Sequence, residues 1–483
     1  MRPNILFFLI DGLRADQCFG KDKTSYTPNI DSLIQKGTYF SNAFASVDGT
    51  IVSLNTIFSS NFQVGNAARS QKVTLIENNL IDTLKNNGYH IYGTLPNQDF
   101  YNSLLEHFEN ENKLDHIENC DLNGEYSIDP VAARFLGKKI KASHSEYEKH
   151  QATLPTGLAK RIIQFLESEE KQEPYFCYFH IFDIHPLREG KKPIGIEDFD
   201  NEKNGSSIYA RTVSSIDFQL GKILELVDLE NTILILTADH GERIPYDGIR
   251  GVDFQPKLDH AVDFGKKILP KSAHKTGGEF LYNIRKFVAK RKLNRSNKQL
   301  TNYQKRSRET FDNVSLFDEM LHVPLLFVNN NINPGIISNT VNHTDILPTL
   351  CGILNINLNH KVNGRNLLPL IQGNNIKENP IYLRTRPYID SKLDKRDSVG
   401  IRTSNYKYFR SIHNPKDSVN LYDLKNDPYE NNNIAETNKE LVDKFEELLL
   451  EIQENDFSEN NGENVEELTH DEIEYELKKM GYV

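Results

Sequence analysis

Short apolar segments alternate with segments of helical periodicity along most of the chain, and this alternation limits the fold more than any other feature. The apolar segments predict strands: NILFFLI, YHIYGT, PYFCYFHIF, TILILTA and VPLLFV. Helices are predicted for TPNIDSLIQKG, NLIDTLKNNG, LAKRIIQFLESEE and SSIDFQLGKILELVD. Parallel strands need crossover connections, and these cover both faces of a sheet. The sequence therefore predicts an α/β fold with a mostly parallel sheet flanked by helices.

The pattern changes near residue 375. The runs PIYLRT, SVGIRT, YKYFRSI and VNLYDL predict short antiparallel strands, and NKELVDKFEELLLEIQE predicts one amphipathic helix. We therefore expect a large domain over residues 1–374, a small α+β domain over residues 375–454, and a linker with a terminal helix over residues 455–483.

Composition and cysteine usage limit the class of protein. The chain has 483 residues, is 38% hydrophobic and carries a formal net charge of -11, which is typical of an acidic globular protein and argues against a nucleic-acid partner. No apolar run approaches the roughly 18 residues of a membrane span. The run at residues 5–10 ends at Asp11 and is too short for a signal peptide. Four scattered cysteines, with no CxxC spacing, predict buried free thiols; they are Cys18, Cys120, Cys177 and Cys351. We expect a cytoplasmic protein.

A basic segment lies within a predicted insertion at about residues 243–313. Its second half, RKFVAKRKLNRSNKQLTNYQKRSR, holds ten Lys or Arg between Arg285 and Arg308. Such a segment is typical of a solvated insertion, and it also offers positive charge to an anionic substrate. Both interpretations stay open.

Polar residues follow three predicted strands at the point where each strand ends. IDGL follows the first strand, HIFDIHP the third and TADHGE the fourth. Functional loops of such sheets lie at the carboxyl ends of the strands. Asp11, Asp239 and His240 offer oxygen and nitrogen ligands that suit a divalent cation. Two acids at matching strand ends therefore predict a metal site.

Together these and further segments resemble the sulfatase family of the alkaline phosphatase superfamily. The segments that carry the resemblance are PNILFFLIDGLRAD, TPNIDSLIQKGTYFSNAFAS, DIHP, ILTADHGE, SLFDEMLHVPLLF, HTDILPTLCGI, NGRNLLPLIQG, YKYFR, LYDLKNDPYENNNIA and ELKKMGYV. They match in order over nearly the whole chain. The resemblance implies an alkaline-phosphatase-like catalytic domain over residues 1–374 and a small C-terminal α+β domain.

The resemblance also implies a metal site, with one change. Its ligands fall on Asp11, Thr50, Asp239 and His240, whereas the second acid of the sulfatase Asp-Asp pair falls on Gly12. A site with fewer carboxylates and an imidazole suits zinc or manganese better than calcium.

Thr50 stands where sulfatases carry the Cys or Ser that is oxidised to formylglycine. The Pro and Arg of the maturation signal are replaced by Val52 and Leu54. Thr50 resembles instead the threonine nucleophile of phosphodiesterases, nucleotide pyrophosphatases and phosphoethanolamine or lipoteichoic-acid transferases of the same superfamily. A hydroxyl bound to a divalent cation has a lowered pKa and attacks phosphorus in line.

Some other positions that are functional in the family are retained in this chain, and others are replaced. His185 matches a histidine that contacts the ester oxygen, which makes it a second catalytic candidate. His180 is expected on the opposite side of its strand. The Gly-Lys-x-His segment that grips sulfate is replaced by GTLPNQDF, and His260, His274 and lysines of the insertion are candidate substitutes.

Three classes of function remain. The preferred one is a metal-dependent hydrolase or transferase acting on a phosphoester or phosphodiester through Thr50. The others are a sulfuric ester hydrolase without formylglycine and a catalytically silent binding protein, against which the joint retention of Asp11, Thr50, Asp239 and His240 argues. The expected partner is an anionic ester from a glycan, a lipid head group or a nucleotide.

Overall fold

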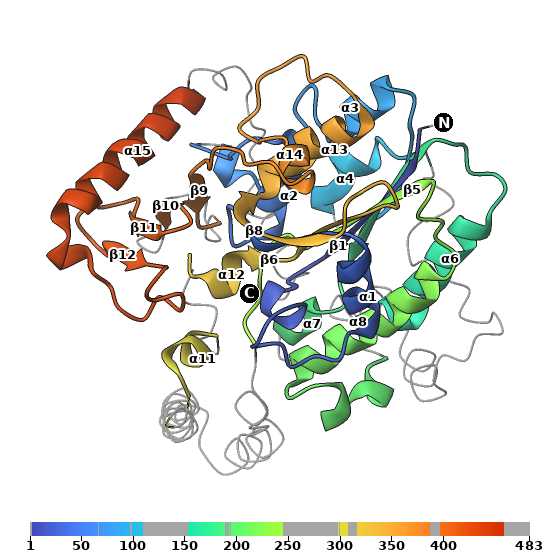
Figure 1. Cartoon of the computed structure of the whole chain (residues 1–483), viewed down its shortest axis with the longest axis horizontal. Coiled ribbons are helices and arrows are strands. Elements are labelled where there is room, and N and C mark those ends of the chain that lie inside the picture. Colours follow the sequence, from blue (N-terminus) through green and yellow to red (C-terminus); the bar gives the residue numbers. More distant parts are fainter. Residues whose placement is uncertain are drawn as a thin grey trace, which may run out of the picture.

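The computed structural model describes residues 2–65, 67–96, 99–109, 153–188, 193, 195–244, 298, 300–307, 316–386 and 397–457. Two sheets organise these residues, a central one of eight strands and a separate one of four (Figure 1). The predicted α/β fold with a small C-terminal α+β part is confirmed. Within the described ranges, no helix has the length and apolarity needed to cross a membrane.

Parallel strands form one half of the central sheet. Its middle strand, β1 (Asn4–Ile10), lies between β4 (Tyr175–Ile181) and β5 (Thr232–Thr237), and β3 (His90–Thr94) flanks β4. All residues of β1, β4 and β5 are buried. Their continuous apolar runs reflect a sheet that is covered on both faces, as predicted.

The other half of the sheet is mixed. Here β7 (Leu325–Val328) is antiparallel to both β5 and β2 (Thr38–Phe44), β6 (His322–Val323) is antiparallel to β2, and β8 (Gly335–Asn342) is parallel to β2. The predicted strand VPLLFV begins within β6 and continues as β7, because Pro324 between them has no backbone N–H to donate to the sheet.

Helices cover both faces of the central sheet (Figure 1). The predicted helices are confirmed as α1 (Pro28–Lys36), α3 (Leu80–Asn86), α6 (Ala159–Glu167) and α8 (Ile208–Leu224). Alternate residues of β1 join two different cores. Leu6, Phe8 and Ile10 pack with residues of α1, α6 and α8. Ile5, Phe7 and Leu9 pack on the other face with residues of α2 (Thr50–Ser59), α3 and α13 (Ile346–Leu354).

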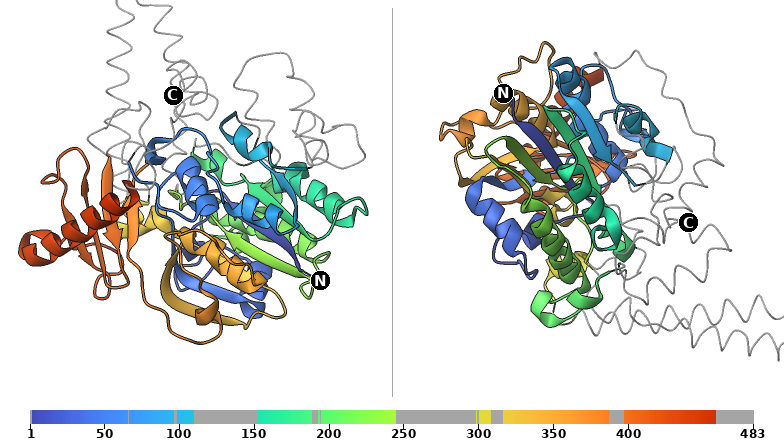
Figure 2. Two further views of the ribbon diagram at one scale, coloured as in Figure 1. Left: turned by 90° about the horizontal axis from the view of Figure 1, so that it is seen from above. Right: turned by 90° about the vertical axis from the view of Figure 1, so that its right-hand side faces the viewer.

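The C-terminal sheet is antiparallel, in the order β12-β11-β10-β9. Its strands are β9 (Ile381–Arg384), β10 (Ser398–Arg402), β11 (Tyr406–Ser411) and β12 (Asn420–Asp423), as predicted. The long helix α15 (Lys439–Phe457) packs on this sheet (Figure 2). The rings of Tyr408 and Phe445 stack between the helix and the sheet. The helix runs three residues beyond residue 454 into the predicted linker, and residues 458–483 lie outside the described residues. The division at residue 375 stays a prediction.

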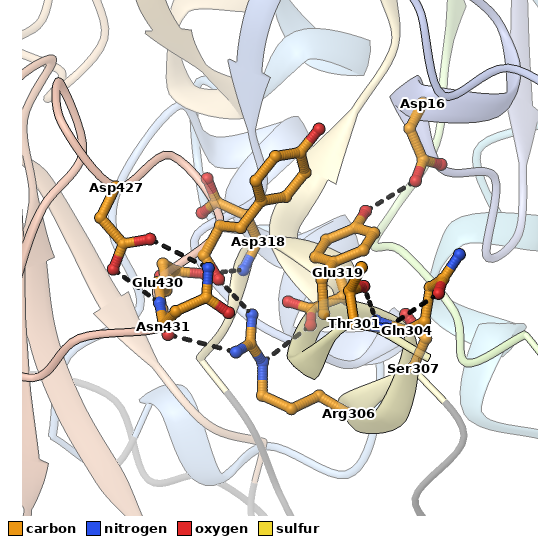
Figure 3. Close-up of polar contacts among 12 residues, drawn as sticks. Asp16, Thr301, Gln304, Arg306, Ser307, Asp318, Glu319, Asp427, Glu430 and Asn431 are labelled. Atoms are coloured by element: carbon orange, nitrogen blue, oxygen red, sulfur yellow. Dashed lines mark hydrogen bonds and ion pairs between the residues drawn. The ribbon is translucent and has the colours of Figure 1, made fainter. Parts of the chain in front are cut away.

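A polar junction joins the central part to the C-terminal sheet (Figure 3). Arg306, at the end of α11 (Asn302–Arg306), pairs with Glu319 at 2.8 Å and donates to the carbonyl oxygens of Tyr429 and Glu430. The backbone N–H of Asp318 donates to the Glu430 carboxylate at 2.9 Å. Arg306, one of the cations of the basic segment, therefore forms contacts within the protein.

Two sequence predictions fall largely outside the described residues. Most of the insertion does so, including His260, His274 and residues 285–297. Three of the four cysteines, Cys18, Cys177 and Cys351, are buried free thiols as predicted, and Cys120 lies outside the described residues.

Candidate active site

Two neighbouring strands bring the predicted metal ligands together. Asp11 follows β1, Asp239 and His240 follow β5, and the two strands are parallel neighbours with Leu9 opposite Thr237. All three side chains are buried. Each offers a ligand atom, and the three atoms lie within 4.8 Å of one another. The convergence expected from matching strand ends is present.

The hydrogen bonds around these residues suit a divalent cation. His240 Nδ1 lies 2.6 Å from the Gly241 carbonyl oxygen, and only a protonated nitrogen donates to a carbonyl. In a neutral imidazole with this tautomer the lone pair is on Nε2, which lies 3.3 Å from Asp239 Oδ2. Among the described residues, neither Asp239 Oδ2 nor Asp11 Oδ1 has a hydrogen-bond partner. Buried carboxylates that face an imidazole lone pair are compensated best by a metal ion.

Gly12 contributes a backbone group instead of a second acid. Its N–H donates to Asp239 Oδ1 at 3.0 Å and so fixes that carboxylate. The φ of Gly12 is +71°, and an added Cβ would lie 3.2 Å from Glu242 Cβ. In this backbone conformation a side chain would be strained as well as crowded, and Gly12 adds no carboxylate to the ligand set.

Thr50 belongs to the same cluster. It is the first residue of α2 and is only partly buried. Its hydroxyl donates to Asp11 Oδ2 at 3.2 Å and lies 3.3 Å from His240 Nε2. The predicted nucleophile thus contacts two of the predicted metal ligands.

Both candidate histidines of the β4 end face Asp11. His185 begins α7 (His185–Arg188), and its Nδ1 lies 3.8 Å from Asp11 Oδ1. His180 Nε2 lies 3.7 Å from Asp11 Oδ2, while its Nδ1 is 2.9 Å from the Tyr178 hydroxyl. The expectation that His180 lies on the opposite side is therefore wrong. The chain leaves the extended conformation after Ile181, so the two-residue alternation does not reach His185.

These contacts determine the charge of Asp11. Burial by itself would raise the pKa of the Asp11 carboxyl, but the imidazoles of His180 and His185, 3.7 and 3.8 Å away, hold this pKa well below its usual value. Asp11 is therefore ionised at neutral pH and available to a cation.

Three further buried groups border the cluster. Arg188 Nε lies 3.2 Å from Glu242 Oε2. Burial would raise the pKa of Glu242, but Arg188 holds it below its usual value. Burial lowers the pKa of His343 to about 4, against the opposing Ala238 carbonyl, so that imidazole is neutral at pH 7.

Sequence reasoning missed these residues, and only some had a usable signal. His180 was named but expected on the opposite side of its strand, and only the register of the structure, which pairs it with Leu9, places it beside Asp11. Arg188 lies three residues after His185, on the same short helix. His343 comes from a segment far along the chain, and no local pattern indicates its place.

The strand end that carries two cations in sulfatases is different here. Residues 95, 96 and 99–101, which directly follow β3, contain neither Lys nor His, and the first such residue is His107. Tyr101 from this segment places its ring edge-on to His180, with centroids 5.4 Å apart. The aromatic ring of Tyr101 therefore borders the site next to His180.

Two family models and several known proteins match this chain. A family model described as Sulfatase matches residues 3–356, and a second, described as N-sulphoglucosamine sulphohydrolase, C-terminal, matches residues 307–455. An ulvan-active sulfatase from Formosa agariphila is 25% identical over 482 residues, covering 90% of this chain and 76% of that protein. An arylsulfatase from Clostridium perfringens is 24% identical over 331 residues, covering 53% of this chain and 68% of that protein.

Solved structures show the same fold at lower identity. A phosphonate monoester hydrolase of Agrobacterium radiobacter has a TM-score of 0.59 at 17% identity, covering 94% of this chain and 96% of that one. A 2-O GAG sulfatase has a TM-score of 0.59 at 17% identity, covering 95% of this chain and 94% of that one.

Proposed function

Because the chain belongs to the sulfatase family, we propose that it is a metal-dependent hydrolase or transferase that attacks a phosphoester or phosphodiester through Thr50. The contact of the Thr50 hydroxyl with Asp11 and His240 is the observation that carries this proposal. It puts a nucleophile in reach of the residues that would hold the cation.

The residues suggest a two-step displacement. A divalent cation held by Asp11, Asp239 and His240 would lower the pKa of the Thr50 hydroxyl and offset negative charge on the ester. Asp11 Oδ2 already accepts the Thr50 hydroxyl hydrogen and orients the oxygen. The Thr50 hydroxyl proton passes to water as Thr50 Oγ1 forms the new bond to phosphorus and the bond to the leaving oxygen breaks in line. A proton from His185 neutralises that oxygen. Water or an acceptor hydroxyl then displaces Thr50.

The chemistry of residue 50 favours phosphorus over sulfur. Oxidation of a threonine side chain gives a ketone and not the aldehyde of formylglycine. Val52 and Leu54, which replace the Pro and Arg of the maturation signal, are buried on α2 and serve its packing. A direct threonine nucleophile is the role that this position supports best.

A sulfuric ester hydrolase is the second candidate. The names of the curated relatives favour it, since they include an ulvan-active sulfatase and arylsulfatases. Such an enzyme would use Thr50 or a water molecule in place of formylglycine. For both candidates, the group that carries the ester is a glycan, a lipid head group or a nucleotide.

The two candidates differ in the ester that they turn over. Metal-free protein is supplied in turn with zinc, manganese and calcium and assayed with an aryl sulfate, an aryl phosphate monoester and an aryl phosphodiester. We expect a phosphoester to be turned over faster than the sulfate, with zinc or manganese best, because the ligand set has few carboxylates and one imidazole. Faster turnover of the sulfate with calcium would reverse the order of the two candidates.

A further inference from the structure

A segment of the C-terminal sheet runs beside the loop that precedes Thr50. Arg384, the last residue of β9, donates its backbone N–H to the Ser46 carbonyl at 2.9 Å and forms a parallel bridge with Val47. Two residues later, the Arg386 N–H donates to Asp48 Oδ1 at 2.7 Å. These contacts fix the position of residue 386 relative to the loop at residues 46–49.

The side chain of Arg386 lies directly against Gly49. A Cβ added to Gly49 would come within 2.8 Å of Arg386 Cδ and 2.9 Å of Arg386 Cβ. The φ of Gly49 is -156°, an extended conformation that any residue adopts. Glycine at this position therefore leaves space for the arginine and is not required by the backbone. The Arg386 guanidinium begins one bond beyond Cδ, next to the residue that precedes the nucleophile.

A second arginine shares this environment. Burial lowers the pKa of Arg243, and the positive charges of Arg386 and Arg188 lower it further, against the opposing effect of Glu242 and Asp48. Arg188 is already ion-paired with Glu242 at 3.2 Å. Arg243 and Arg386 are both partly buried. The Arg243 backbone N–H donates to Glu242 Oε1 at 2.7 Å, which places this residue beside the Arg188–Glu242 pair at the site edge. Like charges at a partly buried site edge favour the binding of an anion.

We propose that Arg386, assisted by Arg243, binds the non-bridging oxygens of the ester group attacked by Thr50. The arginines would replace the Lys and His that the segment after β3 lacks. Guanidinium groups present paired N–H donors that match a tetrahedral oxyanion, so the ligand class is a phosphate or sulfate ester. This inference deepens the proposed function and rests on it for the position of the attacked group.

Binding of inorganic phosphate to the zinc-loaded full chain, measured by calorimetry, tests the inference without turnover. Arg386→Ala should weaken phosphate binding at least tenfold, and Arg386→Lys should recover part of it because the charge remains but the paired donors are lost. Gly49→Ala should weaken phosphate binding similarly, because the added methyl displaces the Arg386 side chain.

Lys416→Ala is the matched control. It removes an exposed charge from the same C-terminal sheet region and should bind phosphate like the wild type. Far-UV circular dichroism checks that each variant is folded.

The outcomes distinguish a failure of this inference from a failure of the proposed Thr50 nucleophile. Thr50→Ala should bind phosphate within a few-fold of the wild type, because the arginines are intact. If Thr50→Ala stays active while Arg386→Ala loses phosphate, the arginine site stands and the proposed nucleophile fails. Wild-type phosphate affinity in a folded Arg386→Ala variant, or no phosphate binding by the wild type, overturns the inference whatever Thr50 does.

Discussion

At the scale of single residues, the hydrogen bond from His240 Nδ1 to Gly241 defines the site most sharply. It orients Nε2 toward Asp239 and Thr50, as a metal-ligating imidazole requires. Aspartate and histidine side chains at strand ends were predictable from the sequence, because polar residues that interrupt a buried apolar run need a reason to be there. The tautomer and its partner were not, since they depend on the turn at Gly241.

Replacing Asp239 or His240 by Ala tests this part of the site. We expect each variant to lose most of its bound zinc or manganese and most activity, because the remaining ligands are too few for tight binding. Metal content after dialysis, measured by mass spectrometry, and turnover are the readouts. His107→Ala removes a half-exposed histidine that faces Asp82 at 4.0 Å and serves as the control. Full metal content in both site variants would show that the cluster is not a metal centre.

Asp183 gives the protein a specific dependence on pH. Burial raises its pKa to about 7, against the opposing backbone hydrogen bonds from Leu154 and from its own N–H. A raised folded-state pKa stabilises the fold fully below the unfolded value of 3.8, and this contribution is lost as pH rises through about 7. The free energy of unfolding of the wild type should therefore fall relative to that of Asp183→Asn, by up to roughly 4 kcal/mol. Urea unfolding of both proteins from pH 4 to 8 measures the difference, and parallel curves would contradict it.

At the scale of elements, the fully buried strands were predictable, and β2 and β8, whose burial is incomplete, were not. The runs of β1, β4 and β5 are apolar throughout, because helices cover both of their faces. In β2 the half-buried Ser41 and Asn42 interrupt the apolar pattern, and β8 is largely exposed over its first five residues. Neither run shows the continuous apolar pattern of β1, β4 and β5. Their pairing with each other identifies them as strands.

The junction with the C-terminal sheet depends on one buried lysine. Lys407 on β11 pairs with Asp318 at 2.5 Å and with Glu430 at 2.7 Å, and its side chain is fully buried. Lys407→Met should destabilise the fold by about 3–5 kcal/mol, because it leaves two buried carboxylates without their shared cation. Lys444→Met breaks an exposed pair with Glu440 and should cost less than about 0.5 kcal/mol. Urea unfolding compares the two variants, and equal small losses would show that the junction contributes little.

At the scale of the whole molecule, the site is assembled from segments that are distant in the sequence. The ends of β1, β4 and β5 and the start of α2 meet at one edge of the central sheet, which strand order makes predictable in outline. Arg386 and His343 come from the last third of the chain. Their positions depend on how the C-terminal sheet and η11 (His343–Asp345) pack, and no local periodicity reports such packing. The sequence therefore indicated the candidate nucleophile and metal ligands that the structure brings together, and it missed the groups that surround them.

The central claim is that Thr50 forms a covalent bond to the transferred group. The most direct measurement is mass spectrometry of enzyme quenched during turnover of a phosphodiester, with the peptide that contains Thr50 sequenced. We expect a phosphoryl or phosphodiester adduct on Thr50, no adduct in Thr50→Ala with activity lower by several orders of magnitude, and partial activity in Thr50→Ser, whose oxygen remains. An active Thr50→Ala variant, or an adduct on another residue, would contradict the account.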